Sequence, residues 1–256
     1  MWSYLDGYQH EIMLALLDSD TPVYDVALSA ENVEFAYARQ RLDVRINNII
    51  SASGASHYKL FVSGEGNFRK EICPLYKANR TQPSPKWREP LRKYLIEEWG
   101  AIECNGYEAD DHCGISQATD GSTIICGIDK DLLQIPGKHY QWPIVRKGEI
   151  VRPGRFWEVS EEQGWRALFT QALTGDVSDN IKGIHMVGHV KASKILADCH
   201  TEEEMFERVW DVYTEDEETD EGMLFQTERL ATNLNLLYIW RSLGITYSIR
   251  REINGI

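Results

Sequence analysis

Short apolar runs that recur along the chain, each closed by turn residues or acids, are the feature that most constrains its fold. Such runs are typical of buried strands, and here they cover residues 12–17, 57–62, 101–104 and 122–128. Helical periodicity fills the intervals between them, at residues 31–50, 87–99 and 108–118. This alternation predicts an α/β domain with a mostly parallel sheet.

Acidic residues fall where such a sheet places its functional groups, outside the carboxyl ends of its strands. The candidates after strands or at the start of a following helix are Asp18, Asp20, Glu65, Glu108, Asp110, Asp111, Asp129 and Asp131, and a further pair is Asp176 and Asp179. Carboxylates that converge repel one another unless cations neutralise them. Magnesium prefers oxygen ligands, and two such ions can hold both oxygens of a phosphoryl displacement. The sequence therefore predicts a divalent-cation site.

Each acidic group alone also fits an ordinary structural position. The segment 108–111 fits a helix cap that complements the helix dipole, and Asp18 or Asp20 fits a turn. Glu65, between two glycines, gives the weakest signal. The metal interpretation rests on the recurrence of acids at successive strand ends.

The net charge of -13 argues against a protein that coats nucleic acid with a uniformly basic surface. Positive charge is concentrated in residues 69–93, and residues 202–221 are strongly acidic, as in a solvated helix and loop. Within the basic segment, Lys77 and Arg80 would lie one helical turn apart beside Tyr76, which could stack on a base. A basic solvated face with a packing tyrosine is the alternative.

A glycine-bearing turn between two helical patterns lies at residues 174–197. Such a turn offers backbone amides to a DNA phosphate, and Lys191 and Lys194 would add cations on one face. The alternative is an ordinary helical hairpin whose glycines allow close packing.

At 256 residues the chain suits an α/β part over residues 1–155 and a helical part over residues 156–256. A possible β-hairpin covers residues 139–151, with its turn at Lys147 and Gly148. No signal peptide or membrane span is recognisable, and five scattered cysteines without a CxxC pair favour a reducing, intracellular setting. We therefore expect a cytoplasmic protein.

Five segments resemble, in the same order, the flap endonuclease and 5′-to-3′ exonuclease family: residues 67–69, 76–80, 108–111, 129–131 and 174–184. The family includes the 5′-nuclease domain of bacterial DNA polymerase I and stand-alone bacteriophage enzymes. The resemblance spans roughly residues 12–197 and implies a PIN-like (Rossmann-like) α/β fold, with a helical arch at about residues 66–99 and a helix-three-turn-helix element at about residues 174–197 that grips duplex DNA. It also implies two magnesium or manganese ions.

By this resemblance, most of the acids are metal ligands and the arch cations are catalytic. The matching acids are Asp18, Glu108, Asp110, Asp111, Asp129, Asp131, Asp176 and Asp179, and the matching cations are Lys77 and Arg80. Substrate contacts are expected from Arg69, Tyr76, Lys77, Arg80, Gly183, Gly188, Lys191 and Lys194. A potassium ion held by backbone carbonyls of residues 183–188 is also implied.

Two positions depart from the family pattern. Met186 stands where the hairpin usually has a glycine, and the lysine that follows is displaced to Lys191. The acid near the arch, usually an aspartate, is Glu65, which we retain with Asp20 as a candidate ligand.

The resulting hypothesis is a 5′-to-3′ exonuclease or structure-specific flap endonuclease of the stand-alone phage type, in the cytoplasm of a bacterium or an infected host cell. It would act on DNA 5′ ends, flaps and duplex junctions, with an RNA/DNA hybrid as a further candidate, and leave 5′-phosphate and 3′-hydroxyl products. No membrane or oligomeric partner is implied. The alternatives are a PIN-type ribonuclease and a structure-specific DNA-binding protein without catalysis.

Overall fold

A computed structural model describes residues 13–146, 149–215 and 219–255, and its centre is a six-stranded sheet in the order β3-β2-β1-β4-β5-β8. The strands are β1 (Leu14–Asp18), β2 (His57–Ser63), β3 (Ile102–Cys104), β4 (Thr123–Cys126), β5 (Gly137–Gln141) and β8 (Arg155–Val159). All neighbouring strands pair in parallel except β5 and β8, which are antiparallel. The expected mostly parallel α/β sheet is confirmed.

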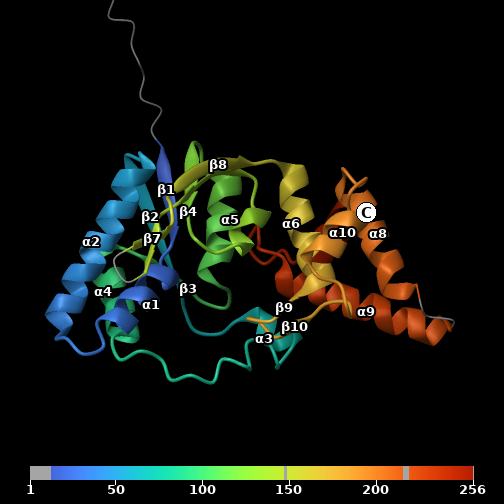
Figure 1. Cartoon of the computed structure of the whole chain (residues 1–256), viewed down its shortest axis with the longest axis horizontal. Helices are drawn as coiled ribbons and strands as arrows, with labels where there is room; N and C mark the ends of the chain where they lie inside the picture. The colour runs from blue at the N-terminus through green and yellow to red at the C-terminus, as the bar shows by residue number, and fades with distance from the viewer. Residues whose placement is uncertain (1–12, 147–148, 216–218, 256) are drawn as a thin grey trace, which may run out of the picture.

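Both faces of the sheet are covered because its strands are apolar on both sides. In β1, Ala15 and Leu17 belong to one buried cluster and Leu16 belongs to the opposite one. The first face is covered by α1 (Asp20–Ser29), α2 (Phe35–Ser53) and α4 (Arg88–Trp99), and the second by α5 (Ala109–Thr119) (Figure 1). The sequence did not predict α1, which begins directly after β1, and α2 starts later than the expected helix.

The C-terminal part is helical, as predicted. Its helices are α6 (Glu161–Thr174), α7 (His189–Ile195), α8 (Glu202–Thr214), α9 (Asp220–Leu237) and α10 (Tyr247–Asn254). They share a separate buried cluster that includes Phe169, Leu234 and Tyr247. The 3₁₀ turn η1 (Asp131–Gln134) packs against α6 and so joins this part to the sheet. Among the described residues, no helix is both long and apolar enough to cross a bilayer.

Two short antiparallel pairs complete the fold. β6 (Ile144–Arg146) pairs with β7 (Glu149–Arg152), and β9 (Gly175–Asp176) pairs with β10 (Ile181–Lys182). The expected hairpin at residues 139–151 is thus divided, because its first residues form β5 of the main sheet. Its predicted turn at Lys147 and Gly148 lies outside the described residues.

The basic insertion is less helical than the resemblance implied. It contains α3 (Phe68–Ile72) and α4, but residues 73–87 form turns and extended chain that connect the two helices along the lower edge of Figure 1. Lys77 has a φ of 56°, which an α-helical turn excludes. The prediction that Lys77 and Arg80 lie one helical turn apart is therefore wrong.

A buried ion pair ties the insertion to both parts of the molecule. Arg69, 2% exposed, donates to Asp111 on α5 through Nη1 at 2.6 Å and Nη2 at 2.8 Å. Its guanidinium also donates to the carbonyl oxygens of Leu236 and Tyr238 at the end of α9. All these groups are buried. Removal of either charged partner would therefore leave the other charge buried without a counter-ion, which is strongly destabilising.

We expect Arg69→Met to lower the free energy of unfolding by about 3–5 kcal/mol, because it leaves the Asp111 carboxylate buried without its counter-ion. Urea unfolding followed by circular dichroism measures the change. The double variant Arg69→Met/Asp111→Leu should recover much of this loss, since it removes the uncompensated charge. A single variant as stable as the wild type would show that the pair does not hold these elements together.

Candidate functional site

Four of the predicted carboxylates line one small cavity. Glu108, Asp110, Asp131 and Asp179 surround a space of ≈ 10 Å³, enough for roughly one water molecule. They come from the start of α5, from η1 after β4, and from the β9–β10 loop. The sequence-based expectation that separate acids converge at the carboxyl edge of the sheet is met for these four.

Asp18 ends β1 beside this group, whereas Asp20 turns away from it. Asp18 accepts a hydrogen bond from the backbone N–H of Asp20 at 3.0 Å, and Asp20 accepts one from the N–H of Ser63 at 3.1 Å. Burial and the neighbouring charges of Asp20 and Asp129 raise the pKa of Asp18 to about 8. Asp20 Oδ1 is buried without a hydrogen-bond partner.

Negative charge is in excess at this edge of the sheet. Burial, Asp111 and Glu108 raise the pKa of Asp110 well above its usual value. Burial and the adjacent Asp129 raise the pKa of Asp131 to about 6. Asp129 itself is exposed and accepts a hydrogen bond from the N–H of Asp131 at 3.0 Å. The acids would therefore gain from a nearby cation.

Two lysines supply positive charge between the sheet and the β9–β10 loop. Lys77 Nζ forms an ion pair with Glu108 and lies 3.8 Å from Asp179 Oδ2. Burial opposes ionisation of Glu108, but Lys77 and Arg69 together hold its pKa below the usual value.

Lys130 forms the second bridge, with Nζ 2.7 Å from Asp131 Oδ1 and 2.5 Å from Asp176 Oδ2. Burial raises the pKa of Asp176, but the bonds from Lys130 and Ser178 outweigh it and lower that pKa. The sequence analysis did not single out Lys130, although it stands between Asp129 and Asp131.

The donor set suits a hard divalent cation, because it consists of carboxylate oxygens without histidine or thiolate. In the described ranges, however, no three such side chains converge tightly enough to enclose an ion as the structure stands. Two of the cavity carboxylates are instead held in ion pairs, Glu108 by Lys77 and Asp131 by Lys130. A cation at the cavity would compete with these two ammonium groups for the Glu108 and Asp131 carboxylates.

Asp111 does not offer the open ligand position that the resemblance implied. Its two oxygens accept from Arg69, from the N–H of Glu108 at 3.0 Å and from the N–H of Trp240 at 3.1 Å. Arg69, expected as a substrate contact, is buried against it. The predictions of Asp111 as a metal ligand and of Arg69 as a substrate contact are both corrected, because these two buried side chains bind each other.

Two further predictions are corrected by burial and exposure. Tyr76, expected to stack on a base, is 2% exposed, and its hydroxyl lies 2.9 Å from both Glu108 Oε2 and Asp179 Oδ2. Glu65 is exposed, and no interaction in the described part of the chain joins its carboxylate to the cluster. Tyr76 therefore supports the carboxylates of the site, and Glu65 lies outside the cluster.

The β9–β10 loop presents its acids because two glycines allow its strands to touch. Gly175 has a φ of 72°, and a Cβ on Gly183 would lie 2.3 Å from the backbone nitrogen of Gly175. Within the loop, Asp176 Oδ1 accepts from the N–H of Ser178 at 2.8 Å. Asp179 accepts from Arg80 Nη2 at 2.7 Å.

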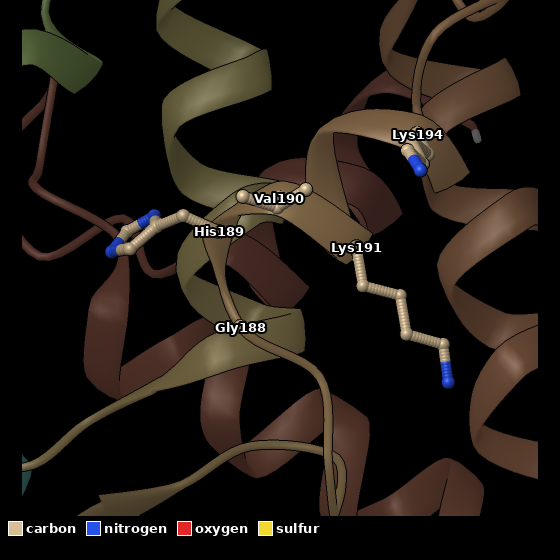
Figure 2. Close-up of a pocket in the computed structure, with 5 residues that line it drawn as sticks. All are labelled: Gly188, His189, Val190, Lys191 and Lys194. Carbon is tan, nitrogen blue, oxygen red and sulfur yellow. The ribbon is translucent and has the colours of Figure 1, made fainter.

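The segment predicted as helix, turn and helix contains the end of α6, the β9–β10 pair and then α7, which begins at His189. Gly188, His189, Val190, Lys191 and Lys194 line a pocket of ≈ 390 Å³, and Figure 2 shows His189 and Lys191 pointing to opposite sides. The side chains of both lysines are exposed. Gly183, also expected there, is engaged internally, since Arg229 donates to its carbonyl at 2.6 Å.

Sequence and structure comparisons identify similar proteins, although no family model matches the sequence. The chain is 30% identical over 191 residues to DNA polymerase I of Lactococcus lactis subsp. cremoris (strain MG1363), a match that covers 67% of this chain and 22% of that protein. It is 27% identical over 157 residues to a 5′-3′ exonuclease of Bacillus subtilis (strain 168), covering 57% and 53%. The chain thus spans about a fifth of the length of the polymerase that it matches.

In three dimensions the chain is similar to the bacteriophage T5 D15 flap endonuclease, solved with DNA and metal ions. The TM-score is 0.58 at 13% identity, and the alignment covers 85% of this chain and 99% of the phage protein. At this identity the likeness establishes a shared fold.

We expect Met186→Gly to stabilise the protein by up to about 1 kcal/mol. Met186 has a φ of 60° and is 79% exposed, so glycine relieves backbone strain and removes little packing. The midpoint of urea unfolding measures the gain. Met186→Ala, which keeps the strained backbone, should give none, and an equal gain in both variants would refute the explanation.

We expect the free energy of unfolding to fall as the pH rises from 5 to 7 in EDTA. The raised pKa of Asp18, about 8, means that the folded state keeps a proton that the unfolded state releases above its pKa of 3.8. One such proton corresponds to about 1.4 kcal/mol per pH unit. Asp18→Asn should therefore show a shallower decline in urea unfolding, and equal slopes would contradict the assignment.

Proposed function

We propose that this chain, which is related in sequence and fold to the flap endonuclease and 5′-to-3′ exonuclease family, is a divalent-metal-dependent nuclease that hydrolyses DNA phosphodiesters. One observation carries the proposal. Glu108, Asp110, Asp131 and Asp179, from three separate segments, face one cavity at the carboxyl edge of a parallel sheet. Acids brought this close together repel one another, and their concentration at one site supports a role in cation binding.

The proposed ligands of two magnesium or manganese ions are the acids at this edge of the sheet and in the adjoining loop. They are Asp18, Glu108, Asp110, Asp129, Asp131, Asp176 and Asp179. Bound divalent ions would supply Lewis-acid stabilisation of phosphate charge. The carboxylates would hold the ions near the scissile phosphate, and the proposed hydrolysis would leave a 5′-phosphate and a 3′-hydroxyl.

Lys77 and Arg80 are the proposed phosphate-stabilising side chains. Both contact Asp179, and the side chain of Arg80 is 57% exposed. With the acids neutralised by bound cations, these two side chains would be free to bind a phosphate. Preorganised groups of this kind contribute a few kcal/mol, on the order of 3, to transition-state stabilisation.

The proposed DNA contacts away from the cavity are Lys191 and Lys194 with the adjoining backbone at Gly188. Substrates would be 5′ ends, flaps and duplex junctions, with RNA/DNA hybrids as a second class. A potassium ion at the hairpin would use carbonyls beyond Gly183, whose own carbonyl is bound by Arg229. The division into parts 1–155 and 156–256 and the cytoplasmic location stay predictions.

We expect Asp131→Asn to reduce cleavage of a 5′-labelled flap duplex at least about 100-fold in magnesium while DNA binding persists, because it removes an anionic ligand. Product lengths on gels and a filter-binding assay measure the two properties, with EDTA as the metal-free control. Glu65→Gln should cleave like the wild type, since Glu65 lies outside the cluster.

The same assay separates the alternatives. Faster cleavage of RNA than of DNA would favour a PIN-type ribonuclease. Tight flap binding by the wild type without cleavage in magnesium or manganese would favour a DNA-binding protein that lacks catalysis.

A further inference from the structure

A buried amide on α6 contacts one of the proposed ligands. Gln171 is 7% exposed, and its Nε2 donates a hydrogen bond to Asp131 Oδ1. The same oxygen also accepts from Lys130, whose side chain is 56% exposed. The Asp131 carboxylate is thus held by two donors, the neutral and buried amide of Gln171 and the charged, exposed side chain of Lys130.

The direction of the Gln171 amide is fixed by a second buried amide, that of Gln134 in η1. Gln134 Nε2 donates to the carbonyl of Leu237 at 2.9 Å, and its Oε1 accepts from the N–H of Ile239 at 3.3 Å. A carbonyl can only accept and a backbone N–H can only donate, so this amide has one orientation.

Gln134 Nε2 also donates to Gln171 Oε1 at 2.7 Å. The oxygen of Gln171 therefore faces Gln134, and its NH₂ group faces Asp131. The backbone groups of Leu237 and Ile239 thus fix the orientation of Gln134, and Gln134 fixes that of Gln171. Neither orientation depends on whether an acid is protonated.

We propose that Gln171 is a positioning residue that fixes the Asp131 carboxylate for cation binding; the inference rests on the nuclease function proposed above. Lys130 would be displaced by a divalent cation bound at the cavity, because it neutralises the Asp131 carboxylate that lines that cavity. Gln171 carries no charge and does not compete with the cation. Its hydrogen bond to Asp131 Oδ1 would therefore restrict rotation of that carboxylate both without and with a bound cation.

Hydrogen bonds of this type to a ligating group typically change metal affinity by about 10–100-fold when removed. The alternative is that the two glutamines only join α6 to η1 and to the end of α9. In that case their loss would lower stability and leave cation affinity unchanged. The two roles are separated by measuring both quantities on one variant.

The test is Gln171→Met, which keeps the volume and the helical preference of glutamine but removes its donor. We expect Mn²⁺ binding to the DNA-free protein, measured by titration calorimetry, to weaken about 10–100-fold. The magnesium concentration for half-maximal flap cleavage should rise by a similar factor, with the rate at saturating magnesium recovering most of its wild-type value.

Gln117→Met is the matched control. Gln117 makes comparable amide bonds, to Thr123 Oγ1 at 2.6 Å and to the carbonyl of Pro136 at 3.2 Å, toward the opposite end of α5 from the cluster. It should lower stability without changing cation affinity.

Wild-type Mn²⁺ affinity in Gln171→Met, together with a lower unfolding free energy, would overturn the inference and leave a structural role. A wild-type protein that binds Mn²⁺ but does not cleave would refute the proposed function, while a weakened affinity in Gln171→Met would still support the positioning role. A wild type that binds no Mn²⁺ would refute both.

Discussion

Repulsion among carboxylates at the carboxyl edge of the sheet is the constraint on which the rest of the structure depends. Burial and mutual repulsion raise the pKa values of Asp18, Asp110 and Asp131, which means that ionised acids destabilise this edge. The fold compensates with cations from outside the sheet. Lys77, Lys130 and Arg69 each pair with an acid of this region, and together they connect the basic insertion, η1 and α5.

This compensation also explains how the two parts of the molecule are joined. Asp111 is fully neutralised by Arg69, whose remaining donors reach the end of α9. Lys77 and Lys130 span the space between the sheet and the β9–β10 loop. Elements that are far apart in the sequence are therefore held together at the place where the proposed chemistry would occur.

Uncharged hydrogen bonds also reach the acidic cavity. Gln134 and Gln171 form a chain of hydrogen bonds from the backbone after α9 to Asp131 and need no charge to do so. In the hairpin, Met186 occupies a left-handed conformation that glycine adopts more easily. The PIN-like fold expected from the resemblance is shared with the phage protein, although residues 73–87 are not helical.

The sequence by itself determined the mostly parallel α/β sheet and showed that acids follow its strands, because apolar runs, helical periodicity and the residues that end them are local patterns. It could not determine which acids stay open and which are neutralised. Asp111 and Asp110 are neighbours in one motif, yet only Asp111 faces Arg69, because the path of the insertion brings that side chain into the core. Tertiary structure likewise decided the contacts of Tyr76 with Glu108 and Asp179, of Lys130 with Asp176 and of Gln171 with Asp131. Contacts between distant segments leave no local pattern in the sequence.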